Sequence, residues 1–133
     1  MESREEARGG RLTEEFRGRT KRFAASVIRL YVRLPKRQEE ATVIGRQFLR
    51  SGTSVAAHVR EASRARSEAE FIAKLGVALQ EADESLLWLE LLREECGVNA
   101  SETQPLEQEA SELIAIMTTM INRTEQRMHP GAR

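Results

Sequence analysis

Residues recur at alternating spacings of four and three along four separate segments of this chain, and that spacing restricts the fold more than any other feature. An α-helix has about 3.6 residues per turn, so residues spaced in this way lie on one side of a helix and can be buried together. In the first segment the repeat consists of Phe16, Thr20, Phe23, Val27, Leu30 and Leu34. No segment alternates apolar and polar residues as a half-buried β-strand does. The sequence therefore predicts an all-α fold.

Proline and small residues characterise the first two expected helices. Pro35 disfavours helical geometry in the residue before it, so the first helix is expected over residues 13–34. The second helix is expected over residues 38–65, and a run of small residues occupies its middle. A glycine within a helix costs about 1 kcal/mol relative to alanine. We therefore expect a neighbouring backbone to approach closely at Gly52.

The other two helices are recognised by their first residues. Ser67 and Glu70 have the spacing of a capping box, in which each side chain accepts a hydrogen bond from the other residue's backbone N–H group. They predict a third helix over residues 68–96. The fourth helix is expected to begin near Thr103 and Pro105, because proline is tolerated in the first turn of a helix.

The expected organisation is one domain between two short terminal segments. Residues 1–12 are expected to form a flexible N-terminal segment, residues 13–126 a four-helix bundle, and residues 127–133 a C-terminal tail. The connections between the helices are short, so successive helices are expected to run antiparallel in an up-and-down bundle. The second helix carries residues suited to packing on more than one side, which favours self-association.

Aromatic residues are expected to pack rather than to bind. All six of them fall on or beside the apolar repeats, and Trp88 is expected in the core or at a boundary between subunits. A platform of exposed rings for base stacking is therefore not expected. Any contact with nucleic acid should be made mainly to phosphate groups.

The residues offer no recognisable set for metal binding or catalysis. A ferritin-like dinuclear site needs two Glu-x-x-His units, and neither His58 nor His129 lies three residues after a glutamate. Cys96 lies at the end of an expected helix, where the negative end of the helix dipole disfavours a thiolate. No glycine-rich phosphate loop or nucleophile elbow is present. We therefore expect a protein that is not an enzyme and that holds no metal or other cofactor.

Membrane and secreted proteins are also disfavoured. Charged residues make up 32% of the chain, and no apolar run approaches the roughly 18 residues that a membrane span requires. Residues 1–11 are charged and contain no apolar segment, so they do not resemble a secretory signal. The single cysteine cannot form an internal disulfide. The expected location is the cytoplasm, without membrane contact.

Positive charge is concentrated in the first half of the chain. The net charge is zero, yet Lys and Arg outnumber Asp and Glu by 16 to 8 in residues 1–66, and the acidic residues outnumber the basic ones by 13 to 5 in residues 67–133. Four arginines of the second helix lie within about 40° of one line opposite its apolar side. They are Arg46, Arg50, Arg60 and Arg64, and we call them the arginine line; Lys36, Arg37 and Arg66 extend it at its ends.

Two interpretations of the arginine line remain open. A guanidinium group matches phosphate geometry with paired hydrogen bonds, so the line predicts binding to the backbone of RNA or DNA. Alternatively, the arginines form ion pairs with glutamates of the third helix, such as Glu81, Glu84 and Glu90. In that case the charge asymmetry between the two halves reflects pairing within the chain or between subunits.

Several segments of the chain resemble one family of bacterial proteins. The matching residues fall in 19–24, 27–31, 34–36, 44–47, 49–57, 60–62, 69–72, 74–75, 81–84 and 88–89. The most specific feature is the segment RSGTSVAA at residues 50–57, followed by a helix that contains Glu70 and Phe71. Over residues 16–97 the chain is similar to the bacterial four-helix-bundle family, also called the 23S rRNA-intervening-sequence protein family.

This resemblance implies an antiparallel four-helix bundle that assembles into a ring-like homopentamer. It also implies kinship with the accessory variability proteins of diversity-generating retroelements, which are basic pentamers that bind nucleic acid and a reverse transcriptase. The present chain has no net charge, and it carries His58 where the family usually has asparagine. If the kinship extends to function, the four residues of the arginine line are those that would carry it.

The residues and the resemblance together predict a non-enzymatic helical bundle that self-assembles, as a homopentamer by the resemblance. Its predicted task is to bind the backbone of RNA or DNA, or to dock a nucleic-acid enzyme such as a reverse transcriptase. The alternative is a purely structural or protein-interaction assembly protein, in which the arginines are used in subunit interfaces.

Overall fold

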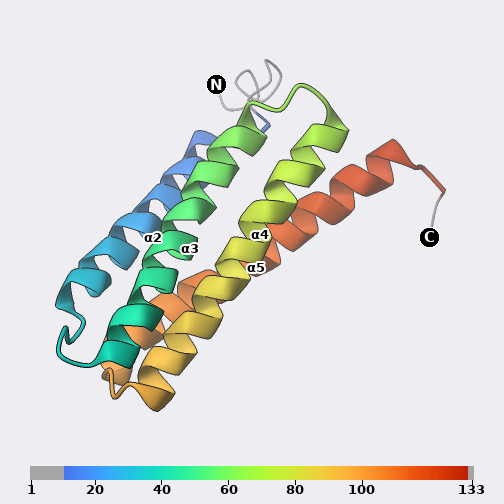
Figure 1. The fold of residues 1–133 in the computed structure, drawn as a ribbon. Helices are drawn as coiled ribbons and strands as arrows, with labels where there is room; N and C mark the ends of the chain where they lie inside the picture. Colours follow the sequence, from blue (N-terminus) through green and yellow to red (C-terminus); the bar gives the residue numbers. More distant parts are fainter. Residues whose placement is uncertain (1–10, 132–133) are drawn as a thin grey trace.

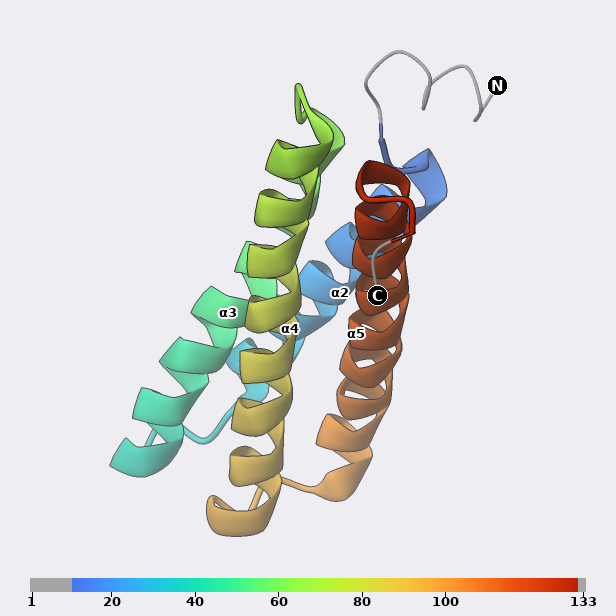
Figure 2. The same cartoon turned by 90° about the vertical axis from the view of Figure 1, so that its right-hand side faces the viewer.

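The fold consists of four α-helices, which are seen in a computed structural model that describes residues 11–131. The helices are α2 (Glu14–Arg33), α3 (Glu39–Ser63), α4 (Glu68–Glu95) and α5 (Ala100–Met128). Each helix packs against the next one along the chain (Figure 1), and α2 also contacts α5, although less extensively. Figure 2 shows α3, α4 and α5 side by side, with α2 passing behind them. Residues 11–131 contain no strand, so the prediction of an all-α fold is confirmed for them.

The residue pairs that join the helices show how the helices face one another. Between α3 and α4, Arg50 bonds to Glu81 and Glu84, whereas Glu61, eleven residues further along α3, pairs with the earlier Lys74. A later residue of α3 therefore contacts an earlier residue of α4. The same order holds between α2 and α5, where the partners are Glu109 and Glu112 for Arg19 and Glu102 for Arg33.

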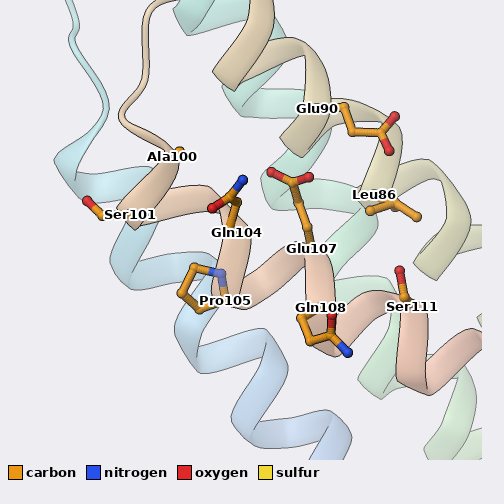
Figure 3. Close-up of a pocket in the computed structure, with 9 residues that line it drawn as sticks. All are labelled: Leu86, Glu90, Ala100, Ser101, Gln104, Pro105, Glu107, Gln108 and Ser111. Atoms are coloured by element: carbon orange, nitrogen blue, oxygen red, sulfur yellow. The ribbon is translucent and has the colours of Figure 1, made fainter.

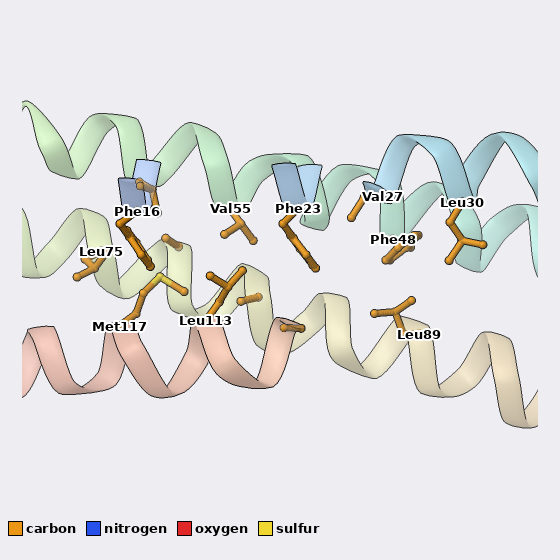
Figure 4. Packing of buried hydrophobic residues seen from close by; sticks show 14 of the residues in the cluster. Phe16, Phe23, Val27, Leu30, Phe48, Val55, Leu75, Leu89, Leu113 and Met117 are labelled. Carbon is orange, nitrogen blue, oxygen red and sulfur yellow. The ribbon is translucent and has the colours of Figure 1, made fainter. Parts of the chain in front are cut away.

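The core is formed by the apolar repeats found in the sequence. All six members of the first repeat are buried, and the polar member, Thr20, donates its hydroxyl to the backbone oxygen of Arg17 at 3.0 Å. Phe48 and Val55 of α3, Leu75 and Leu89 of α4, and Leu113 and Met117 of α5 are fully buried. Figure 4 shows these side chains meeting between the four helices. Spacing alone identified the side of α2 that faces the core, whereas in α4 the buried side also includes Ala78 and Ser85, next to the half-buried Leu79 and Leu86 of the expected repeat.

The N-terminus of α4 is capped much as the sequence predicted. The Ser67 hydroxyl accepts a hydrogen bond from the backbone N–H of Glu70 at 3.0 Å. The Glu70 carboxylate reaches back to the backbone N–H of Arg66 at 2.7 Å, one residue before the group that a standard capping box uses. The two contacts fix the short connection between α3 and α4.

Loss of this cap should be measurable. We expect Ser67→Ala to lower the free energy of unfolding by about 1 kcal/mol, because a first-turn N–H group loses its acceptor. A suitable control is Ser101→Ala, since Ser101 is exposed and uses only its backbone N–H in the cap of α5. Urea denaturation of the two variants compares them directly. Equal stability of both variants would show that the Ser67 cap contributes nothing.

The predicted start of the fourth helix was wrong by three residues or more. Helix α5 begins at Ala100, because the Asn99 side chain accepts a hydrogen bond from the backbone N–H of Ser101 at 2.9 Å and caps the helix there. Pro105 consequently lies inside the helix, after its first turn, rather than at its start.

The predicted N-terminal segment proves to be partly packed. Residues 1–10 lie outside the described residues. Leu12 is buried, and Arg11 donates its backbone N–H to Ser63 at 3.2 Å and its side-chain Nε to Ala65 at 3.0 Å, both to backbone oxygens. Arg11 and Leu12, the last two residues of the expected segment, therefore pack against the bundle. At the other end, α5 continues to Met128, two residues beyond the expected end of the bundle.

Helices α2 and α3 approach closely at Gly52, as its position among small residues suggested. A Cβ atom at Gly52 would lie 2.6 and 2.7 Å from the two methyl groups of Val27. The neighbour is thus a side chain of α2 rather than its backbone. A Cβ atom at Gly45 would lie 2.7 Å from the Leu34 side chain. Two glycines of α3 therefore make room for apolar side chains of α2.

Apolar residues of α2 and α4 also face outward. Ile28 and Val32 of α2 are 47% and 68% exposed, and Val77 and Leu87 of α4 are 36% and 47% exposed. Trp88 of α4 is half-buried against the core, and its Nε1 atom is buried without a hydrogen-bond partner in the described part of the chain. Apolar side chains thus occur on more than one side of α4.

Candidate nucleic-acid interface

All four residues of the arginine line are exposed. Arg46, Arg50 and Arg60 belong to α3, and Arg64 is the residue at its C-terminal cap. Among residues 11–131, no side chain forms a hydrogen bond or ion pair with Arg46, Arg60 or Arg64. Arg60 lies fourteen positions after Arg46, which is about 21 Å along a helix. These three guanidinium groups remain available to a ligand.

Arg50 differs from the other three because it is held by α4. Its Nη1 atom lies 3.2 Å from a Glu81 carboxylate oxygen, and its Nη2 atom lies 2.9 Å from Glu84. The hydrogen bond that Arg50 donates to Glu81, followed by the charges of Glu81 and Glu84, raises the pKa of Arg50. Of the two interpretations of the arginine line, ion pairing with α4 therefore applies at Arg50.

The charge asymmetry between the halves of the chain is partly balanced by pairing between helices. On α2, Arg19 bonds to Glu109 and Glu112 of α5, each at 2.7 Å, and these carboxylates raise its pKa despite partial burial. Between α3 and α4, Lys74 lies 3.0 Å from Glu61 and lowers the pKa of that carboxyl. The pairs of Arg19 thus join a basic residue of the first half to acidic residues of the second, whereas the pair of Lys74 and Glu61 has the opposite order.

A cavity of about 610 Å³ lies where α3 connects to α4, and we call it the corner cavity. Its lining residues are Ala56, Ala57, Arg60, Glu61, Arg64, Arg66, Glu70 and Lys74. Its three arginines were expected from the sequence, since two belong to the arginine line and Arg66 extends it. Lys74 was not expected there, because it reaches the cavity only where α4 folds back along α3. No local pattern could have indicated this meeting.

A second cavity, of about 670 Å³, lies between α4 and α5 and has a different charge (Figure 3). Glu90 and Glu107 line it together with Gln104 and Gln108, and neither Lys nor Arg contributes to its lining. Glu107 is paired with Arg93 at 2.9 Å, and that hydrogen bond lowers its pKa. Because carboxylates repel phosphate groups, this cavity does not suit nucleic acid. Glu90, which was a candidate partner of the arginine line, lines this second cavity instead.

His58 contacts the backbone of its own helix, and Cys96 lies in the core. The Nδ1 atom of His58 lies 2.9 Å from the backbone oxygen of Ser54, four residues earlier on α3. Cys96 is buried, and burial raises the pKa of its thiol, as do the charges of Glu40 and Glu95. Across residues 11–131, no three His, Cys, Asp or Glu side chains gather in a way that could hold a metal ion.

Among the described residues, no helix combines the length and the apolar composition needed to cross a bilayer.

Comparison with known proteins supports the resemblance found in the sequence. No curated protein matches the chain. A solved structure of a protein of unknown function from the S23 ribosomal protein family of Bacteroides thetaiotaomicron is 34% identical. It has a TM-score of 0.70 and covers 79% of this chain and 96% of its own. The model of the 23S rRNA-intervening sequence protein family matches residues 15–119. The predicted membership is thereby confirmed, and the chain belongs to the 23S rRNA-intervening sequence protein family.

Proposed function

We propose that this protein is a non-enzymatic, cytoplasmic, antiparallel four-helix bundle that self-assembles and binds the phosphate backbone of RNA or DNA without a cofactor. The observation that carries the proposal is the set of unpaired arginines on α3. Arg46, Arg60 and Arg64 are exposed and have no side-chain partner within residues 11–131. A guanidinium group binds phosphate with two parallel hydrogen bonds and releases a condensed counterion when it does so.

Self-assembly would repeat this basic surface. Helices α2 and α4, which carry the exposed apolar pairs Ile28/Val32 and Val77/Leu87, are not packed as neighbours within the described bundle. Two different apolar surfaces on one subunit allow head-to-tail contacts, which close into a ring when the rotation between subunits permits. A ring-like homopentamer, which the family resemblance implies, would present the arginines several times and strengthen weak contacts by avidity. Such a ring could also dock a nucleic-acid enzyme such as a reverse transcriptase.

The test is the salt dependence of binding to an oligonucleotide. We expect the affinity of the unmodified protein to fall steeply with salt and to depend little on base sequence. Changing Arg46, Arg60 and Arg64 together to glutamine should reduce the slope of log K against log salt by about one unit for each arginine in contact with phosphate. Fluorescence anisotropy with labelled RNA and DNA measures both the affinity and the slope.

The control for this experiment is Arg123→Gln on α5, an exposed arginine outside α3. It removes charge from a different helix and should leave the salt slope nearly unchanged. If Arg123→Gln lowers the affinity as much per arginine as the triple variant does, binding depends on total charge and not on a defined surface on α3. Absence of binding to either RNA or DNA at low salt would contradict the proposal itself.

The ion pairs of Arg50 favour a second candidate function. Because Arg50 is engaged by Glu81 and Glu84, the arginine line can also serve to hold protein surfaces together. In a purely structural assembly protein, the remaining arginines would meet acidic residues of a neighbouring subunit. The triple glutamine variant would then lose its multimeric mass in light scattering, whereas the nucleic-acid proposal expects that mass to persist.

A further inference from the structure

Positive charge on α3 is concentrated at one end of the helix rather than spread along it. Engagement of Arg50 by α4 leaves Arg46 separated from Arg60 by about 21 Å. Arg60 and Arg64, in contrast, line the corner cavity together with Arg66. The structure therefore offers a nucleic-acid strand one cluster of available arginines and not a continuous track.

The two carboxylates of the corner cavity are already occupied by other partners. Glu61 lies 3.0 Å from Lys74, and its charge is compensated there. Glu70 accepts the backbone N–H of Arg66 at 2.7 Å, in the cap of α4. Within residues 11–131, no carboxylate lies within ion-pairing distance of the guanidinium groups of Arg60, Arg64 and Arg66. Three arginines consequently converge on this cavity without an ion-pair partner in the described part of the chain, and its four basic side chains outnumber its two carboxylates.

A terminal phosphate is the part of a nucleic acid that suits such a cluster best. A phosphate monoester carries a charge of about −1.5 to −2 at neutral pH and presents three acceptor oxygens, whereas each backbone diester carries a single charge. Several guanidinium forks can therefore bind one monoester at the same time. Ala56 and Ala57, which also line the cavity, have short side chains and leave space for the terminal nucleoside.

We propose that the corner cavity binds the terminal phosphate monoester of a nucleic-acid strand. This inference rests on the proposed function and makes it more specific, because it assigns the end of the strand to Arg60, Arg64 and Arg66. Arg46, which lies outside the cavity, contacts internal diesters of the same strand or of another one. The protein thus distinguishes a strand that ends in a phosphate from one that ends in a hydroxyl.

The experiment compares short single-stranded oligonucleotides of one sequence that carry a 5′-phosphate, a 3′-phosphate or hydroxyl groups at both ends. We expect one of the phosphorylated forms to bind about tenfold more tightly than the hydroxyl form. Arg60→Gln and Arg64→Gln should each remove most of this ratio. The matched control is Arg46→Gln on the same side of α3, which should weaken all forms equally and preserve the ratio.

The outcomes separate this inference from the proposed function. Equal affinity for all three oligonucleotides would overturn the terminal-phosphate site and leave backbone binding in place. A preference that survives Arg60→Gln and Arg64→Gln would overturn the assignment to the corner cavity. Failure of every oligonucleotide to bind at low salt would overturn both proposals. Because both arginines are exposed, circular dichroism should show unchanged helix content in the variants.

Discussion

Replacing Gly52 with alanine is expected to lower the free energy of unfolding by about 1–3 kcal/mol, although alanine is the better helix former. The added Cβ would lie 2.6 and 2.7 Å from the Val27 methyl groups and 3.1 Å from the Val27 Cβ. Atoms cannot remain this close, so α2 and α3 would have to separate or Val27 would have to leave its preferred rotamer. Chemical denaturation measures the loss.

The chain supplies both a control and a rescue for this experiment. An added Cβ at Gly76 of α4 would have no atom within 4 Å apart from those of its chain neighbours and its own helix backbone, so Gly76→Ala should raise the free energy of unfolding by about 1 kcal/mol through helix propensity alone. Combining Gly52→Ala with Val27→Ala removes the two clashing methyl groups and should be less harmful than the sum of the single changes. Additive effects would mean that the two residues do not constrain each other.

Introducing a charge at Leu87 is expected to reduce the proposed assembly to single subunits of 15.1 kDa. Leu87 is 47% exposed in the isolated subunit, and in the proposed ring it is covered by a neighbour. An unpaired carboxylate buried in that contact would cost about 3–5 kcal/mol for each interface. Light scattering of Leu87→Glu gives the mass directly.

The control for this change is Gln126→Glu, which adds the same charge at an exposed polar position of α5, away from the exposed apolar residues of α2 and α4. It should leave the multimer intact. Val32→Glu, which targets the exposed apolar surface of α2, should dissociate the assembly as Leu87→Glu does. An unmodified protein that has the mass of one subunit, or a multimer that tolerates both glutamates, would contradict the ring.

Local patterns in the sequence predicted the helices well because helices are formed by local interactions. The spacing of apolar residues identified the buried side, and Ser67 and Glu70 located the start of α4. The start of α5 was missed because Pro105 was given more weight than Asn99. Asparagine is a favoured N-cap residue, so the signal was present in the sequence. Its side chain contacts the backbone N–H of Ser101.

The candidate site was predicted only in part, because it depends on how two helices are aligned. All four members of the arginine line were correctly placed on the outer side of α3. The sequence could not show that Arg50 alone reaches Glu81 and Glu84, since that choice depends on the register between α3 and α4. The register between α3 and α4 also places Lys74 beside Glu61, so Glu61 pairs with Lys74 and not with Arg60 or Arg64.

The edge between α2 and α5 implies that stability is unevenly distributed in this bundle. Exposed or half-exposed ion pairs from Arg19 and Arg33 span that edge, and a cavity of about 300 Å³ lies beside them. Such pairs contribute about 0–1 kcal/mol each and are weakened by salt. Local opening should therefore begin where α5 leaves α2, with faster amide hydrogen exchange there than between α3 and α4. During folding, contacts between consecutive helices close only short loops. The contact between α2 and α5 closes a much longer loop, because α3 and α4 lie between the two helices along the chain.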